Sequence, residues 1–128
     1  MQPKILLIED NEQNRYLTTF LLEKNGYQVV AAEDGPTGVA LAAKIRPDAI
    51  LLDIQLPGMD GYSVAKALRE CPSLDDVPIV AVTSYAMAGD REKALGSGCD
   101  GYLEKPINPE TFVSQVESYL QQSKDGAS

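Results

Sequence analysis

The chain has 128 residues, enough for one domain with a single hydrophobic core. Hydrophobic residues make up 44% and charged residues 23%, a balance that excludes disordered and membrane-spanning classes of protein. The formal net charge of -8 argues against binding to nucleic acid or to an anionic membrane, because both are polyanions.

Histidine is absent, which excludes Ser-His-Asp and Cys-His nucleophile systems and all histidine-based zinc sites. Cys71 and Cys99 lack the spacing of a metal site, and two cysteines do not make a disulfide framework. We therefore expect free thiols in the reducing cytoplasm. The apolar run near the N-terminus is too short for a signal peptide, and no run approaches the length of a membrane span.

Short apolar runs alternate with longer segments of helical periodicity along the whole chain. Runs of this length that are rich in Ile, Val and Leu are typical of central parallel strands. The predicted strands are ILLI (5–8), QVVAA (28–32), AILL (49–52), IVAV (79–82) and, more weakly, GYLE (101–104).

The first predicted helices occupy residues 11–25 and 35–46. In the first helix, Leu17, Phe20 and Leu21 are spaced i, i+3, i+4, so we expect them to form the buried face. Gly26 is a natural stop for this helix. In the second helix Pro36 suits the first turn, and Leu41, Ala42 and Ile45 share one face.

Three more helices are predicted at 61–71, at 90–98 and from residue 108 onward. Val64, Ala65 and Leu68 form the inner face of the 61–71 helix, whereas the glycine-rich 90–98 helix is the weakest of the five. The last helix begins with Asn108 as N-cap, and its inward residues are Val113, Val116 and Leu120. We expect a domain over residues 1–122 and a flexible tail over 123–128.

This fivefold alternation predicts a doubly wound α/β sandwich of (βα)5 type, with helices on both faces of a five-stranded parallel sheet. The order 2-1-3-4-5 is a standard arrangement for five such strands, as in flavodoxin-like folds. Ligands then bind at the carboxyl ends of the first and third strands, where the winding reverses.

Polar side chains follow four of the predicted strands at this edge. Glu9 and Asp10 follow the first strand, Asp53 the third, Thr83 the fourth and Lys105 the fifth. Singly, each has an ordinary structural explanation: Asp10 or Asn11 as a helix cap, Asp53 as a turn or cap, Thr83 as a strand residue, Lys105 as a solvated charge. Their joint placement at one edge favours a functional site.

Three carboxylates repel one another in a partly desolvated site unless a hard divalent cation lies among them. Mg²⁺ prefers six oxygen ligands, including one or two carboxylates and waters. We expect Asp10 and Asp53 to bind it directly, Glu9 through water, and the backbone carbonyl of Gln55 to supply a further ligand. With the Lys105 ammonium and the Thr83 hydroxyl nearby, this set predicts a phosphoryl acceptor in which Asp53 is the nucleophile.

Four motifs carry a resemblance to the receiver domains of two-component response regulators. Each motif is weak alone, whereas the ordered set is specific, and the similarity covers residues 4–120. The motifs are LLIEDN (6–11), LLDIQLPGMDGY (51–62), VAVTSYAM (80–87) and GYLEKPI (101–107).

The resemblance implies roles for individual residues. Glu9 and Asp10 would serve Mg²⁺, for which Mn²⁺ is expected to substitute, and Asp53 would be phosphorylated. Thr83 would move toward the phosphoryl group, and Lys105 would form an ion pair with it.

Two further expectations follow from the resemblance. Tyr102 would swing inward together with the threonine hydroxyl on activation. The peptide bond between Lys105 and Pro106 would be cis, as it often is in the family.

The resemblance also implies a signalling protein rather than a conventional enzyme, although one that catalyses its own phosphorylation and dephosphorylation. A sensor histidine kinase or a histidine phosphotransfer protein would donate the phosphoryl group. The surface of helix 90–98, strand 101–104 and the last helix would then change its protein partners, with the chain a monomer or a phosphorylation-dependent dimer. We expect no DNA, no membrane and no output domain.

Alternatives of other classes remain. A stand-alone receiver is favoured over one excised from a hybrid histidine kinase, because the chain starts with Met1. A haloacid dehalogenase-type phosphatase would need a second Asp where Gln55 stands. A flavodoxin-like cofactor protein would need hydroxyls rather than the carboxylates of the first loop to bind phosphate. A receiver that docks partners without phosphorylation is the principal alternative.

Overall fold

The structure is a computed structural model that describes residues 2–55, 60–83, 89–104 and 108–127. Strands and helices alternate along these residues as the sequence predicts. In chain order the elements are β1 (Lys4–Ile8), α1 (Glu12–Lys24), β2 (Gln28–Ala32), α2 (Gly35–Ile45), β3 (Ala49–Asp53), α3 (Gly61–Arg69), the 3₁₀ turn η1 (Pro72–Leu74), β4 (Ile79–Thr83), α4 (Asp90–Gly96), β5 (Gly101–Glu104) and α5 (Pro109–Ala127).

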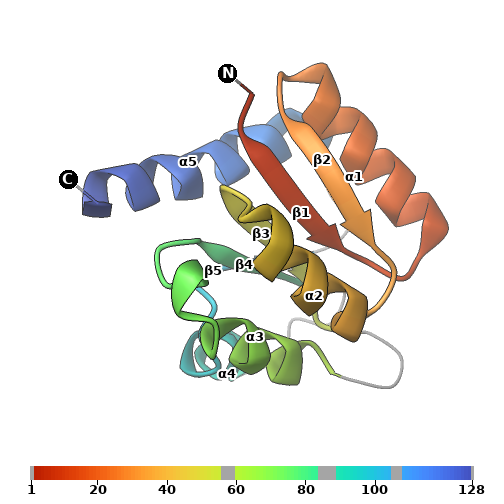
Figure 1. The fold of residues 1–128 in the computed structure, drawn as a ribbon. Helices are drawn as coiled ribbons and strands as arrows, with labels where there is room; N and C mark the ends of the chain where they lie inside the picture. Colours follow the sequence, from red (N-terminus) through yellow and green to blue (C-terminus); the bar gives the residue numbers. More distant parts are fainter. Residues whose placement is uncertain (1, 56–59, 84–88, 105–107, 128) are drawn as a thin grey trace.

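The strands form one parallel sheet in the order β2-β1-β3-β4-β5, which confirms the predicted topology. Helices α2, α3 and α4 cover one face of the sheet, and α1 and α5 cover the other (Figure 1). Because every strand runs in the same direction, all the carboxyl ends lie at one edge.

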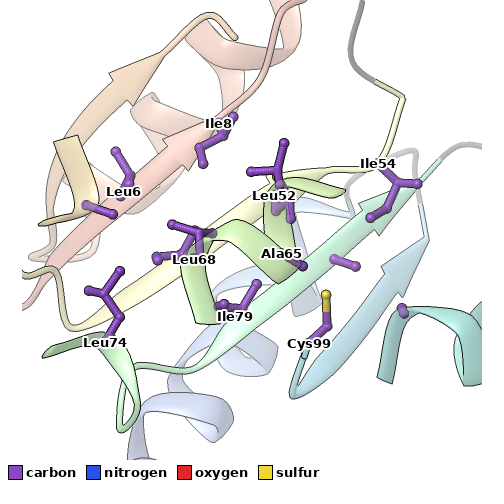
Figure 2. Packing of buried hydrophobic residues seen from close by; sticks show 14 of the residues in the cluster. Leu6, Ile8, Leu52, Ile54, Ala65, Leu68, Leu74, Ile79 and Cys99 are labelled. Carbon is purple, nitrogen blue, oxygen red and sulfur yellow. The ribbon is translucent and has the colours of Figure 1, made fainter. Parts of the chain in front are cut away.

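Side chains alternate between the two faces along each strand, so the sheet separates two hydrophobic clusters. In β1, Leu6 and Ile8 point to the side of α2 and α3, whereas Ile5 and Leu7 point to the side of α1 and α5. Figure 2 shows the first cluster, with Leu68 of α3 packed over the sheet. The strands β1, β3 and β4 are buried on both faces, which explains why they read as continuous apolar runs.

The buried face of α1 differs from the prediction. Leu17 is 40% and Phe20 is 51% exposed, and only Leu21 of the expected set is buried. The buried set is Thr18, Leu21 and Leu22, which has the same i, i+3, i+4 spacing rotated by one residue. Thr18 was not among the residues expected on the buried face, and its side chain is buried with the leucines.

Side-chain caps fix where the helices begin. The side-chain oxygens of Asn11, Asp34 and Asp60 accept hydrogen bonds from the third residue of their helices over 2.9, 2.8 and 3.0 Å. Asn108 accepts one from the backbone of Glu110 over 2.9 Å, which supports its predicted role as N-cap of α5. These bonds satisfy backbone donors that lack a partner within the first helical turn.

Helix α5 extends to Ala127 and thus passes residue 122, where the sequence predicts the domain to end. The predicted flexibility of 123–128 stays a prediction. Across the described residues, no helix has both the length and the apolar composition that crossing a bilayer requires.

Candidate functional site

The topology brings the predicted acidic residues together at the carboxyl edge of the sheet. Strands β1 and β3 are neighbours, with Ile8 opposite Leu52, so Asp53 lies one position beyond this pair. Glu9 and Asp10 directly follow β1, and the backbone N–H of Glu9 still donates to the carbonyl of Ala32 at the end of β2 over 3.0 Å.

One carboxylate oxygen from each of Glu9, Asp10 and Asp53 lies within 4.8 Å of the other two. Glu9 and Asp53 are only 3% and 4% exposed, and Asp10 opens to solvent. Three carboxylates this close repel one another, and partial burial strengthens the repulsion. The donor set, oxygen only and partly open to water, fits a hard divalent cation such as Mg²⁺.

Of the cap alternatives, Asn11 as the cap of α1 is confirmed, whereas Asp10 and Asp53 as helix caps are excluded. Asn11 rather than Asp10 caps α1, and Asp60 rather than Asp53 caps α3. The side chain of Asp53 does accept a hydrogen bond from the backbone N–H of Gln55 over 3.0 Å, which fixes the direction of the chain as it leaves β3. One of its oxygens therefore takes part in a local turn, within the same acidic cluster.

Gln55 makes a second contact that the sequence does not predict. Its side-chain amide donates a hydrogen bond to the hydroxyl of Thr83 over 2.8 Å. Thr83 ends β4 and is 2% exposed, so this bond links the loop after β3 to the predicted switch hydroxyl. The predicted metal-ligand role of the Gln55 carbonyl stays a prediction.

Arg15, one turn into α1, is the residue that sequence reasoning missed. Its Nη1 donates to the backbone carbonyls of Glu9 and Asp10 over 3.1 and 3.3 Å, and its Nη2 pairs with the carboxylate of Glu33 at 3.4 Å. The only signal in the sequence is an arginine four residues after the N-cap Asn11.

The remaining predicted residues belong to β5 and the segment after it. Tyr102 lies on β5, is half-buried and packs against the cluster that faces α2, α3 and α4. Glu104 lies opposite Thr83 in the register of β4 and β5. Lys105 and Pro106, with the predicted cis bond between them, lie outside the described residues.

Curated relatives resemble the chain over nearly its whole length. It is 40% identical over 120 residues to the polar-differentiation response regulator DivK of Brucella anthropi. The matched region covers 94% of this chain and 98% of that protein. It is 39% identical over 120 residues to the protein of the same name from Brucella ovis, with the same coverage.

Solved structures share the fold. A CheY-like receiver domain protein from Methanospirillum hungatei superposes with a TM-score of 0.91 at 25% identity, covering 98% of this chain and 99% of that chain. The receiver domain of the sensor histidine kinase PA1611 from Pseudomonas aeruginosa superposes with a TM-score of 0.87 at 36% identity, covering 94% and 99%. That structure holds a magnesium ion in its active-site cleft.

A family model described as the response regulator receiver domain matches residues 5–117. Receiver domains are signalling domains that bind Mg²⁺ at an acidic cluster and interact with histidine kinases and downstream targets. In this chain, Glu9, Asp10 and Asp53 form an acidic cluster that fits such a Mg²⁺ site. The chain therefore belongs to the response regulator receiver domain family of two-component signalling.

Proposed function

We propose that Asp53 accepts a phosphoryl group from a phosphohistidine on a sensor histidine kinase or a histidine phosphotransfer protein. The observation that carries this proposal is the position of one buried carboxylate. Asp53 lies within 4.8 Å of the oxygens of Glu9 and Asp10, and Gln55 bonds both to it and to the Thr83 hydroxyl. The residues proposed as nucleophile, metal ligands and hydroxyl donor therefore lie at one edge of the sheet.

In the transfer, an oxygen of the Asp53 carboxylate attacks the phosphorus of the donor. A new O–P bond forms, the N–P bond of the phosphohistidine breaks, and its electron pair returns to the imidazole. Glu9 and Asp10 would hold Mg²⁺, or Mn²⁺ in its place, and the cation would supply positive charge to the transferring oxygens. The Lys105 ammonium would balance the remaining charge. In the reverse modification, water attacks the phosphorus, the O–P bond to Asp53 breaks, and inorganic phosphate leaves as the carboxylate is restored. We propose that the domain catalyses both reactions itself.

The switch begins at Thr83. Its hydroxyl oxygen accepts a hydrogen bond from the Gln55 amide in this structure. We propose that the hydroxyl moves toward a phosphoryl group on Asp53, to which its O–H would donate. We propose that Tyr102 follows this movement and alters the surface of α4, β5 and α5. That surface then binds a downstream protein or a second copy of the phosphorylated chain.

The donor docks on α1 in this proposal. An imidazole reaches Asp53 only if its protein covers the carboxyl edge of the sheet, and α1 begins at that edge. Further along α1, Leu17 and Phe20, at 40% and 51% exposure, present an apolar surface together with the exposed Tyr16. Exposed apolar surface of this kind is typical of protein–protein contacts.

The docking proposal predicts different results for a small-molecule phosphoryl donor and for a protein donor. In the double variant Leu17→Ser, Phe20→Ser, we expect acetyl phosphate to phosphorylate Asp53 as in wild type, because the site is intact. Transfer from a phosphorylated histidine kinase should fall at least about tenfold, as expected when two buried interface side chains are lost. Leu95→Ser, which changes the exposed apolar residue of α4, is the control and should leave transfer unchanged. Equal transfer in the α1 variant and the control would contradict the docking site.

The acceptor itself is tested with a small phosphoryl donor and intact-protein mass spectrometry. We expect a single phosphoryl adduct that needs Mg²⁺ and is lost in Asp53→Asn. Asp75→Asn, which changes an exposed carboxylate after η1, should keep the adduct. A folded wild-type protein that binds Mg²⁺ but forms no adduct would instead support a receiver that docks partners without phosphorylation.

A further inference from the structure

Arg15 lies against the loop that carries the acidic pair, and its guanidinium makes three polar contacts. The Nη1 group donates to the carbonyl oxygens of Glu9 and Asp10 over 3.1 and 3.3 Å, and Nη2 lies 3.4 Å from a carboxylate oxygen of Glu33. The Arg15 side chain is 19% exposed, so these bonds are partly shielded from water.

These contacts hold the backbone of the two residues whose carboxylates line the site. On the other side of the same loop, the N–H of Glu9 donates to the carbonyl of Ala32 over 3.0 Å. The loop between β1 and α1 is thus tied to α1 through Arg15 and to β2 through Ala32. Glu33, the residue after Ala32, orients the guanidinium through its second nitrogen.

The charge of Arg15 opposes the function of the site. A guanidinium beside a cation site repels the cation, so electrostatics alone predicts weaker Mg²⁺ binding when arginine is present. The fork geometry has the opposite effect. Nη1 donates to both carbonyls while Nη2, held in the same rigid plane, reaches Glu33, whereas a lysine ammonium offers its donors from a single point on a flexible stem.

From this geometry we propose that Arg15, oriented by Glu33, is a positioning residue of the Mg²⁺ site: it fixes the backbone of Glu9 and Asp10 so that both carboxylates converge with Asp53. The proposal rests on the function proposed above, since it concerns the same cation. Groups that orient metal ligands through hydrogen bonds typically change metal affinity 10- to 100-fold, roughly, when they are removed.

The test measures Mg²⁺ affinity by calorimetry in the absence of any phosphoryl donor. We expect Arg15→Met, which keeps the aliphatic stem and loses the fork, to bind Mg²⁺ about tenfold more weakly than wild type. Arg15→Lys keeps the charge but offers a point donor, and it should also bind more weakly. Lys44→Met, which removes a positive charge from the exposed last turn of α2, is the charge-matched control and should bind like wild type.

Charge repulsion and backbone positioning predict opposite changes in the Mg²⁺ affinity of Arg15→Met. Unchanged or tighter Mg²⁺ binding by Arg15→Met would overturn the positioning role, because loss of charge alone strengthens binding. Thermal unfolding checks that each variant is folded. If Arg15→Met does not fold, Arg15→Lys takes its place: it keeps the charge and loses the planar guanidinium, and wild-type affinity in that variant would equally overturn the proposal.

A second readout reports the loop directly. The backbone amide resonances of Glu9, Asp10 and Asn11 should shift or broaden in Arg15→Met before any metal is added. Wild-type resonances there would contradict the proposal even if affinity falls. The proposed function is judged separately, by whether wild-type protein forms the Asp53 adduct.

Discussion

At the scale of single residues, the loop after Asp53 is closed by a backbone contact that leaves no space for a side chain. The N–H of Gly61 donates to the carbonyl of Ile54 over 2.9 Å, and a Cβ at position 61 would overlap the backbone of Ile54. We expect Gly61→Ala to lower the free energy of unfolding by about 1–3 kcal/mol, measured by urea denaturation. Gly96→Ala, where a Cβ meets nothing within 4 Å, is the control. An equal loss of unfolding free energy in both variants would contradict the close approach of Gly61 to the backbone of Ile54.

The two cysteines differ in environment. Both are free thiols, but Cys71 is half-buried whereas Cys99 lies in the core, and burial raises the pKa of Cys99 to about 11. Because the thiolate is the reactive form, we expect iodoacetamide at about pH 8 to label Cys71 in the native protein and Cys99 only after unfolding. Peptide mass mapping distinguishes the sites. Equal labelling rates in the native protein would show that Cys99 is not buried.

At the scale of elements, the Asp60 cap of α3 makes stability depend on pH. The backbone N–H of Ser63 donates to its carboxylate and lowers its pKa below the ordinary value of 3.8. A carboxylate with a lowered folded-state pKa stabilises the protein above its unfolded-state pKa, and this stabilisation is lost as the pH falls through the folded-state pKa. Asp60→Ala should therefore cost about 1 kcal/mol near pH 7 and progressively less below about pH 4.

Urea unfolding of wild type and Asp60→Ala across this pH range measures the difference. The control is Asp60→Asn, which retains a capping oxygen without a titratable group and should retain most of the stability near neutral pH. A cost of Asp60→Ala that is the same at neutral and acid pH would contradict a role for the ionised carboxylate.

The elements were largely predictable from the sequence, and the error in the buried face of α1 has a physical cause. The strands β1, β3 and β4 are buried on both faces and produce continuous apolar runs, whereas the edge strands β2 and β5 are only partly buried. A parallel sheet of alternating elements also leaves few topologies. The predicted buried face of α1 is displaced by one residue from the observed face, because Thr18 can pack as an apolar residue. The stripe of Leu17 and Phe20 then faces solvent, where apolar periodicity alone cannot separate a core from a docking surface.

At the scale of the whole molecule, the sequence predicts those parts of the candidate site whose residues are brought together by strand order alone. Glu9, Asp10 and Asp53 converge because β1 and β3 are neighbours. The contacts of Arg15 with backbone carbonyls and of the Gln55 amide with Thr83 depend on side-chain conformations and loop paths. These have no periodic signature in a sequence, so only the three-dimensional structure reveals them.

Phosphorylation is expected to alter α4 and β5 at a distance from Asp53. Helix α4 is short, and Lys93 on it lies 4.6 Å from the ring centroid of Tyr62 on α3. We expect hydrogen exchange of the backbone amides in residues 90–104 to change when the protein is phosphorylated, while α2 stays unchanged. Exchange in 90–104 that is indifferent to phosphorylation would count against this switch.

The central claim is that Asp53 carries the phosphoryl group, and chemical mapping of the adduct tests it most directly. Borohydride reduces an acyl phosphate of aspartate to homoserine, which peptide mass spectrometry locates in the sequence. The account predicts homoserine at position 53 only, in protein treated with a phosphoryl donor and Mg²⁺, and none when Mg²⁺ is left out. Homoserine at position 10 instead, or an unreduced Asp53 in protein that carries the adduct, would contradict it.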